Sequence, residues 1–155
     1  MSDPVIHCIY ASTSGNVEIV VETVARIWQS QGLSTELHRS EQTKIDLIQN
    51  NQNFLFATST WDRGTLNPFF VPLLEEMKKI DFTGKKAAFI GLGDIRYESV
   101  FFNRGIDFIH DAWKANQGEV LFRMLKLNGD PYAQLDTVVK PWAEGAGPLF
   151  KENHG

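Results

Sequence analysis

The sequence predicts an α/β domain in which five parallel strands form one doubly wound sheet between two layers of helices. Short apolar runs alternate with longer segments of helical period, as they do in repeated βα units. Two runs, Phe54 to Ala57 and Ala87 to Ile90, are apolar throughout, which indicates strands buried on both faces. A length of 155 residues suits one domain, residues 1–155, with its own core.

Each predicted strand is followed by a predicted helix. We expect strands at Pro4 to Tyr10, Ser34 to His38, Asn53 to Ala57, Lys86 to Gly91 and Glu119 to Leu127. We expect helices at Asn16 to Gln31, Thr43 to Asn50, Asn67 to Lys79, Val100 to Asn116 and Tyr132 to Glu144. In the first helix, apolar residues from Val17 to Trp28 recur at three- and four-residue spacing, and Gly32 is expected to end it. The tail from Gly145 is expected to be loosely held.

Composition excludes several classes of function. The formal net charge is -4 and basic residues cluster no further than Lys78-Lys79 or Lys85-Lys86, so no nucleic acid partner is expected. The sequence shows neither a secretory signal nor a run of roughly 20 apolar residues. A cytoplasmic protein without membrane contact is therefore expected, with Cys8 as a small buried hydrophobe in a reducing compartment.

Neither a metal site nor a catalytic site is predicted. The histidines are scattered without the spacing typical of metal ligands, so we expect packing roles for His7, His38, His110 and His154. No Ser/His/Asp arrangement is recognisable, and no catalytic residue is assigned.

Three loops are expected at the carboxyl edge of the sheet, where open α/β folds bind ligands. The first, Ser12 to Asn16, runs from a strand into a helix, so its hydroxyls and free amides suit a phosphate, although an ordinary helix cap explains the same residues. In the second, Thr58 to Gly64, Trp61 either stacks on a ligand or packs on a helix. The third, Gly91 to Glu98, has glycines that allow close approach or simply make turns. There is no dinucleotide fingerprint and no Walker lysine.

With these loops the sequence resembles the short-chain flavodoxin family over nearly its whole length. Tyr10-Ala11-Ser12-Thr13-Ser14-Gly15-Asn16-Val17-Glu18 is similar to the family's phosphate loop, and Ser59-Thr60-Trp61 to its second loop. Gly91-Leu92-Gly93-Asp94-Ile95-Arg96-Tyr97-Glu98 is similar to the family's third loop, and Leu127-Asn128-Gly129-Asp130-Pro131 to the family's exit from the fifth strand. The fifth strand has no long insertion, which places the resemblance with the short-chain class.

The resemblance implies the flavodoxin-like strand order 2-1-3-4-5 and a bound flavin mononucleotide (FMN). The phosphate loop and Ser59 would hold the phosphate, Trp61 and Tyr97 would stack on the flavin ring, and Asp94 with the backbone of Leu92 and Gly93 would hold its polar edge. The full set implied to bind FMN is Ser12, Thr13, Ser14, Gly15, Asn16, Val17, Ser59, Thr60, Trp61, Asp62, Leu92, Gly93, Asp94 and Tyr97.

The chain departs from the family pattern in three ways, one of which is a net charge that is only mildly acidic, with Arg63 and Arg96 beside the implied ring site. Val17 stands where the family usually has a threonine, and a lost hydrogen bond to a charged group costs about 1.5 to 3 kcal/mol. Asp62 stands where many relatives have glycine, so a reorientation of the peptide after it toward the flavin is expected to cost more.

The function implied by the resemblance is a low-potential one-electron carrier, not an enzyme. It would work as a monomer between a donor reductase and an acceptor enzyme. Two alternatives stay open: a small flavin-dependent NAD(P)H or quinone reductase, for which the chain has no spare segment, and a module that has lost its cofactor, at which Val17 hints. A receiver-like signalling domain would need acidic residues where Ser12-Thr13 stands.

Overall fold

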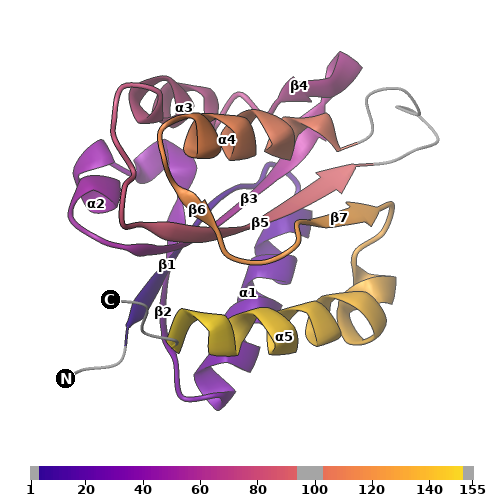
Figure 1. Cartoon of the computed structure of the whole chain (residues 1–155). Helices are drawn as coiled ribbons and strands as arrows, with labels where there is room; N and C mark the ends of the chain where they lie inside the picture. Colours follow the sequence, from indigo (N-terminus) through magenta and orange to yellow (C-terminus); the bar gives the residue numbers. More distant parts are fainter. Residues whose placement is uncertain (1–3, 94–102, 152–155) are drawn as a thin grey trace.

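The computed structural model describes residues 4–93 and 103–151, apart from the side chain of Asp62, and shows one parallel sheet (Figure 1). The first strands are β1 (Val5–Ala11), β2 (Ser34–Arg39), β3 (Asn53–Trp61) and β5 (Lys86–Gly93). The fifth predicted strand forms as two pieces, β6 (Glu119–Val120) and β7 (Leu125–Asn128), which both pair with β5. The order β2-β1-β3-β5 followed by these pieces confirms the predicted order 2-1-3-4-5.

Helices cover both faces of the sheet, so the predicted three-layer architecture is confirmed. α1 (Asn16–Ser30) and α5 (Lys140–Lys151) lie on one face in Figure 1. α2 (Ile45–Gln49), α3 (Val71–Met77) and α4 (Arg104–Ala115) lie on the other. Helical turns precede some of these helices, namely η1 (Ser40–Gln42), η3 (Tyr132–Gln134) and the π-helical η4 (Leu135–Val139).

The two faces of the central strands bury two separate cores. Along β3, Phe54 and Phe56 pack in the core beneath α3 and α4, whereas Leu55 and Ala57 pack in the core beneath α1 and α5. All four side chains are fully buried, which explains why this run is apolar at every position. Cys8 is also fully buried, as predicted, and burial raises the pKa of its thiol well above the ordinary value.

The end of α1 follows the prediction from Gly32. This residue has a φ of +87°. Its amide donates to the Gln29 carbonyl at 3.0 Å, and the Leu33 amide donates to the Trp28 carbonyl at 2.9 Å, as in a Schellman motif. The side chain of Trp28 then packs edge-on against Phe150 of α5, with 5.2 Å between ring centroids.

The chain after Gly145 corrects the expectation of a loose tail. Residues up to Lys151 belong to α5, because Ala146 and Phe150 continue an apolar stripe that is buried against α1. The helix begins later than predicted, at Lys140, because η3 and η4 occupy the preceding residues.

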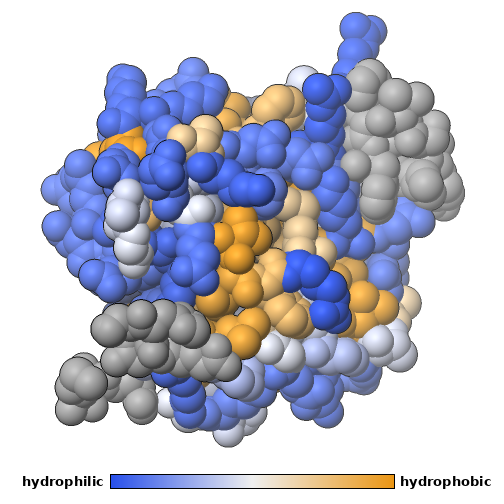
Figure 2. Space-filling view, viewed as in Figure 1, coloured by the Kyte–Doolittle hydropathy of each residue, from blue (hydrophilic) through white to orange (hydrophobic). Residues whose placement is uncertain are grey.

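The break between β6 and β7 also differs from the single predicted strand. The Arg123 carbonyl accepts a hydrogen bond from Trp142 Nε1 of α5 at 2.7 Å. In a continuous strand this carbonyl would instead accept from an amide of the neighbouring strand. Phe122 lies beside Trp142, with ring centroids 6.1 Å apart. Figure 2 shows hydrophobic side chains reaching the surface in the middle of the view, where β6 and β7 edge the sheet in Figure 1.

Two further elements, β4 and α3, differ from the prediction. β4 (Thr65–Leu66), which was not predicted, pairs antiparallel with the end of β3. α3 starts at Val71 instead of Asn67, because the Asn67 carboxamide oxygen accepts from the Phe69 amide at 2.9 Å and forms a turn ahead of the helix. No helix within residues 4–93 and 103–151 has the length and apolar character needed to cross a membrane.

Candidate functional site

A cavity of about 410 Å³ opens at the carboxyl ends of β1, β3, β5 and β7. It is lined by Thr13, Ser14, Asn16, Val17, Ser59, Thr60, Leu92, Gly93, Gly129 and Asp130. Three loops that lie far apart in the sequence therefore meet at one place, as the parallel topology predicts. Gly129 and Asp130 are the lining residues that were not assigned to the site from the sequence.

The first loop divides its polar groups between capping α1 and facing the cavity. The Ser12 hydroxyl is buried and accepts hydrogen bonds from the Gly15 amide at 3.1 Å and the Glu18 amide at 3.4 Å. Four amides at a helix start lack intrahelical acceptors, and those left over are the amides of Asn16 and Val17. The capping interpretation therefore holds for Ser12. Because Asn16 and Val17 line the cavity, their amides still offer a site for an anion.

A network from the neighbouring strand holds the first loop in place. Arg39, at the end of β2, donates from Nη2 to the Ser12 carbonyl and pairs with Glu41 at 2.8 Å. Tyr10 donates to Glu18 at 2.7 Å. Desolvation, followed by this hydrogen bond, raises the pKa of Tyr10 to about 12, so its hydroxyl keeps its proton at neutral pH.

The second loop was predicted to start at Thr58, but β3 extends to Trp61, so Ser59 and Thr60 belong to the end of this strand. Their hydroxyl groups have protons that are available. Asn67 is fully buried and donates from Nδ2 to Ser59 Oγ at 3.0 Å. The Gly105 amide donates to Thr60 Oγ1 at 2.9 Å. A side chain at Gly105 would put its Cβ 2.8 Å from the Ser59 carbonyl oxygen, so the glycine permits this close contact. Because both hydroxyls accept these bonds, each can donate its own proton toward the cavity.

Trp61 is the last residue of β3 and is 40% exposed, although it does not line the cavity. The turn after it, η2 (Asp62–Gly64), connects β3 to β4. Its left-handed residues are Arg63, with a φ of 57°, and Gly64, with a φ of 76°. The left-handed conformation in this turn therefore lies at Arg63 and Gly64, the two residues that follow Asp62.

The third loop is described only at its beginning. Leu92 and Gly93 line the cavity, and the Gly93 carbonyl accepts a hydrogen bond from the Gly129 amide at 2.8 Å. This bond brings the exit of the last strand to the site, a position that was not predicted from the sequence. The predicted residues Asp94 and Tyr97 lie outside the described residues.

The donor set fits a phosphorylated ligand. Among the described lining residues, the polar groups are backbone amides, hydroxyls, the carboxamide of Asn16 and the carboxylate of Asp130. Neutral N–H and O–H donors at a helix start bind phosphate well. Gly15, with a φ of +88°, gives the loop its turn into α1 and, like Ser12, does not line the cavity.

The fold and the site together define a doubly wound α/β domain with an anion-binding loop after its first strand. The family model for flavodoxin matches residues 8–142, and the chain belongs to the flavodoxin family. A probable flavodoxin 2 from Bacillus subtilis is 32% identical over 126 residues, which cover 79% of this chain and 81% of the relative.

Solved structures agree on the fold. A short-chain flavodoxin associated with a non-canonical PDU bacterial microcompartment superimposes with a TM-score of 0.85 at 22% identity, covering 95% of this chain and 99% of that one. A Fusobacterium nucleatum flavodoxin bound to flavin mononucleotide gives a TM-score of 0.78 at 18% identity, covering 95% and 96%. Flavodoxins bind FMN and pass electrons to redox partners, so this chain is an electron-transfer protein and not an enzyme.

Proposed function

We propose that the chain binds one FMN in the cavity at the carboxyl edge of its sheet and carries single electrons at low potential. The observation that supports this most directly is that the Ser12 hydroxyl takes the amides of Gly15 and Glu18 and leaves the first-turn amides of Asn16 and Val17, two residues that line the cavity. A phosphate placed there would satisfy both donors and the positive end of the helix dipole.

The residues then divide into those that contact the phosphate and those that shape its loop. Thr13, Ser14 and Asn16 would donate to the phosphate from side chains and amides, with Ser59 and Thr60 adding hydroxyl protons. Val17 would contribute its amide only, because its side chain is buried in the core with α5. Ser12 and Gly15 would act by holding the loop in shape.

The flavin ring would lie toward the second and third loops. In this proposal Trp61 and Tyr97 stack on its two faces, the backbone of Leu92 and Gly93 meets its polar edge, and Asp94 and Asp62 flank it. FMN supplies the one-electron chemistry when bound. The aromatic side chains exclude water from the ring, and the acidic groups disfavour negative charge on it, which lowers the potential of the second reduction.

We further propose that residues 1–155 form a single domain that works as a monomer in the cytoplasm. A reductase would supply its electrons and a separate enzyme would accept them. Exposure of Trp61 supports transfer by direct contact with such partners, because this side chain is already at the surface beside the site.

Titration of the purified protein with FMN tests the proposal. We expect a yellow protein that binds FMN one to one, quenches its fluorescence at micromolar concentration and takes up two electrons in two resolved steps during reductive titration. It should consume NAD(P)H only when a separate reductase is added. A colourless protein without quenching would contradict the proposal, and steady NAD(P)H oxidation by the protein alone would favour a reductase.

Replacing Trp61 or Tyr97 by alanine should weaken FMN binding by about two- to tenfold. Stacked aromatic contacts contribute about 0.5 to 1.5 kcal/mol beyond the area they bury. Phe69→Ala is a matched control, because Phe69 is similarly exposed, at 42%, and lines a different cavity near α2 and α3. If all three variants had the affinity of the unmodified protein, the placement of the ring would be wrong.

A further inference from the structure

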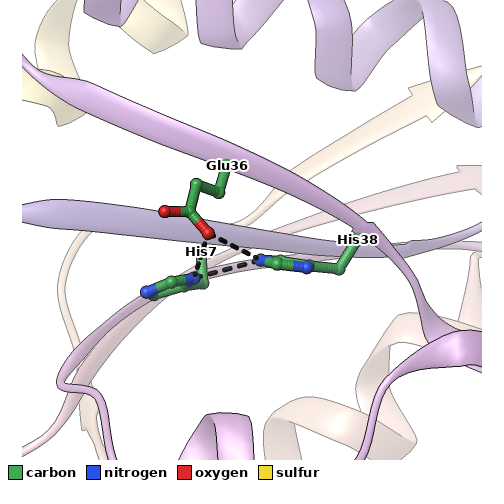
Figure 3. Close-up of side chains that lie close together, drawn as sticks. All are labelled: His7, Glu36 and His38. Carbon is green, nitrogen blue, oxygen red and sulfur yellow. Dashed lines mark hydrogen bonds and ion pairs between the residues drawn. The ribbon is translucent and has the colours of Figure 1, made fainter.

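Three potential metal ligands meet on the outer two strands of the sheet, away from the FMN cavity. His7 lies on β1, and Glu36 and His38 lie on the edge strand β2 (Figure 3). In the parallel register Glu36 pairs with His7, and His38 pairs with Ile9 two positions further on. Residues paired across parallel strands, and residues two apart on one strand, face the same side. All three side chains therefore converge on one point.

The distances between their donor atoms match a small coordination sphere. His7 Nδ1 lies 3.1 Å from His38 Nε2. The Glu36 Oε1 atom lies 3.7 Å from each of these nitrogens. Tetrahedral zinc, with bonds of about 2.0 to 2.1 Å to nitrogen and oxygen, holds its ligand atoms about 3.3 Å apart. The three edges of this triangle lie within a few tenths of an ångström of that spacing.

The three groups also satisfy one another poorly without an ion. The two imidazole nitrogens can form one hydrogen bond, in which one ring donates its proton and the other accepts. The carboxylate oxygen lies beyond hydrogen-bond distance from both rings. A divalent cation at the centre would replace the shared proton and give each of the three groups a bond.

The rigidity and exposure of the cluster suit an exchangeable ion. The His7 ring is buried, stacks on His38 with 5.2 Å between centroids and lies 6.1 Å from the Phe54 ring. The Glu36 side chain is 58% exposed, so it offers a path for an ion and leaves one position open to water. Ligands on strands whose rings are fixed by packing need little rearrangement to bind.

We propose that His7, Glu36 and His38 form a binding site for Zn²⁺, with two imidazole ligands, one carboxylate ligand and a fourth position for water. The donor set favours zinc over Mg²⁺ or Ca²⁺, which take six or more ligands that are mainly oxygen. The ion would link β1 to the edge strand β2. Since Arg39 follows His38 directly and braces the phosphate loop, the ion would also hold the strand that carries this brace.

Calorimetric titration with ZnCl₂ tests the site in the FMN-loaded protein, prepared without a histidine tag and freed of metal by a chelator. We expect one saturable Zn²⁺ per chain and a higher melting temperature with zinc, because the ion binds the folded state. Co²⁺ in the same site should show the visible bands of a tetrahedral complex. Free FMN, titrated alone, corrects for zinc held by the phosphate.

Glu36→Gln and His38→Gln should each weaken zinc binding by about tenfold or more and remove the rise in melting temperature. Glu36 is the safer replacement because its side chain is mostly in water, whereas replacing the buried His7 risks the fold. His110→Gln is the matched control, since His110 pairs with Asp111 at 3.1 Å and no third potential ligand joins them among the described residues. The proposal would be overturned if the Glu36 and His38 variants bound zinc as tightly as the unmodified protein, or if the His110 variant lost as much zinc affinity as they do. The absence of a saturable site in the unmodified protein would also overturn it. None of these results depends on electron transfer, so failure here leaves the FMN proposal standing.

Discussion

FMN should bind at least about a hundredfold more tightly than riboflavin, which has the same ring and no phosphate. Each hydrogen bond to a charged group contributes about 1.5 to 3 kcal/mol, and the amides of Asn16 and Val17 provide two. The sum of these two contributions corresponds to an affinity for FMN that is roughly one hundred times that for riboflavin, or more. Fluorescence quenching with the two ligands under the same conditions measures the ratio directly.

A variant of the first loop separates the phosphate contribution from that of the ring. Thr13→Val should weaken FMN binding and leave riboflavin binding unchanged, because Thr13 lines the cavity at the phosphate end. Thr83→Val is the matched control, since the Thr83 hydroxyl donates to Asp81 in a turn before β5. Equal affinities for FMN and riboflavin in the unmodified protein would mean that the phosphate binds elsewhere.

Replacing Trp113 by alanine should lower the free energy of unfolding by about 3 to 5 kcal/mol. The Trp113 side chain is fully buried in the core beneath α3 and α4. It stacks on Phe82 with 4.3 Å between centroids and meets Phe54 and Phe56 edge-on. Its Nε1 donates to the Glu119 carbonyl at 2.9 Å, so truncation leaves a large cavity and also removes this hydrogen bond.

Urea unfolding at saturating FMN measures this loss of unfolding free energy. Bound FMN stabilises the unmodified protein and the Trp113→Ala variant equally if their affinities for FMN agree. Phe108→Ala, on the same helix and 40% exposed, should change the free energy of unfolding by less than about 1 kcal/mol. A loss below about 1 kcal/mol for Trp113→Ala would show that this core repacks around the missing ring.

The sequence predicts the centre of the fold better than its margins. The middle parts of β3 and β5, Phe54 to Ala57 and Ala87 to Ile90, are buried on both faces, so each run is apolar at every position and the pattern identifies it. The break between β6 and β7 depends on a hydrogen bond from Trp142 to the Arg123 carbonyl, which no local pattern encodes. The extension of α5 depends likewise on packing of Phe150 against Trp28, residues that lie far apart in the sequence.

The site shows the same division between local and distant information. Loops that follow strands could be located from the sequence, and eight of the residues assigned to FMN do line one cavity. The role of Ser12 could not be separated from a phosphate contact, because capping and phosphate binding favour the same residue types. The convergence of His7, Glu36 and His38 could not be predicted from the sequence, because it arises from the pairing of two strands.

The bond from Arg39 to the Ser12 carbonyl connects the cofactor loop to a strand with only one neighbour. Among the residues that the structure describes, β2 pairs with β1 alone and ends the sheet path, and edge strands open more readily than central ones. Opening of β2 at its Arg39 end would remove this brace from the loop. In the proposed site, we therefore expect the affinity for FMN to depend on this local opening of β2.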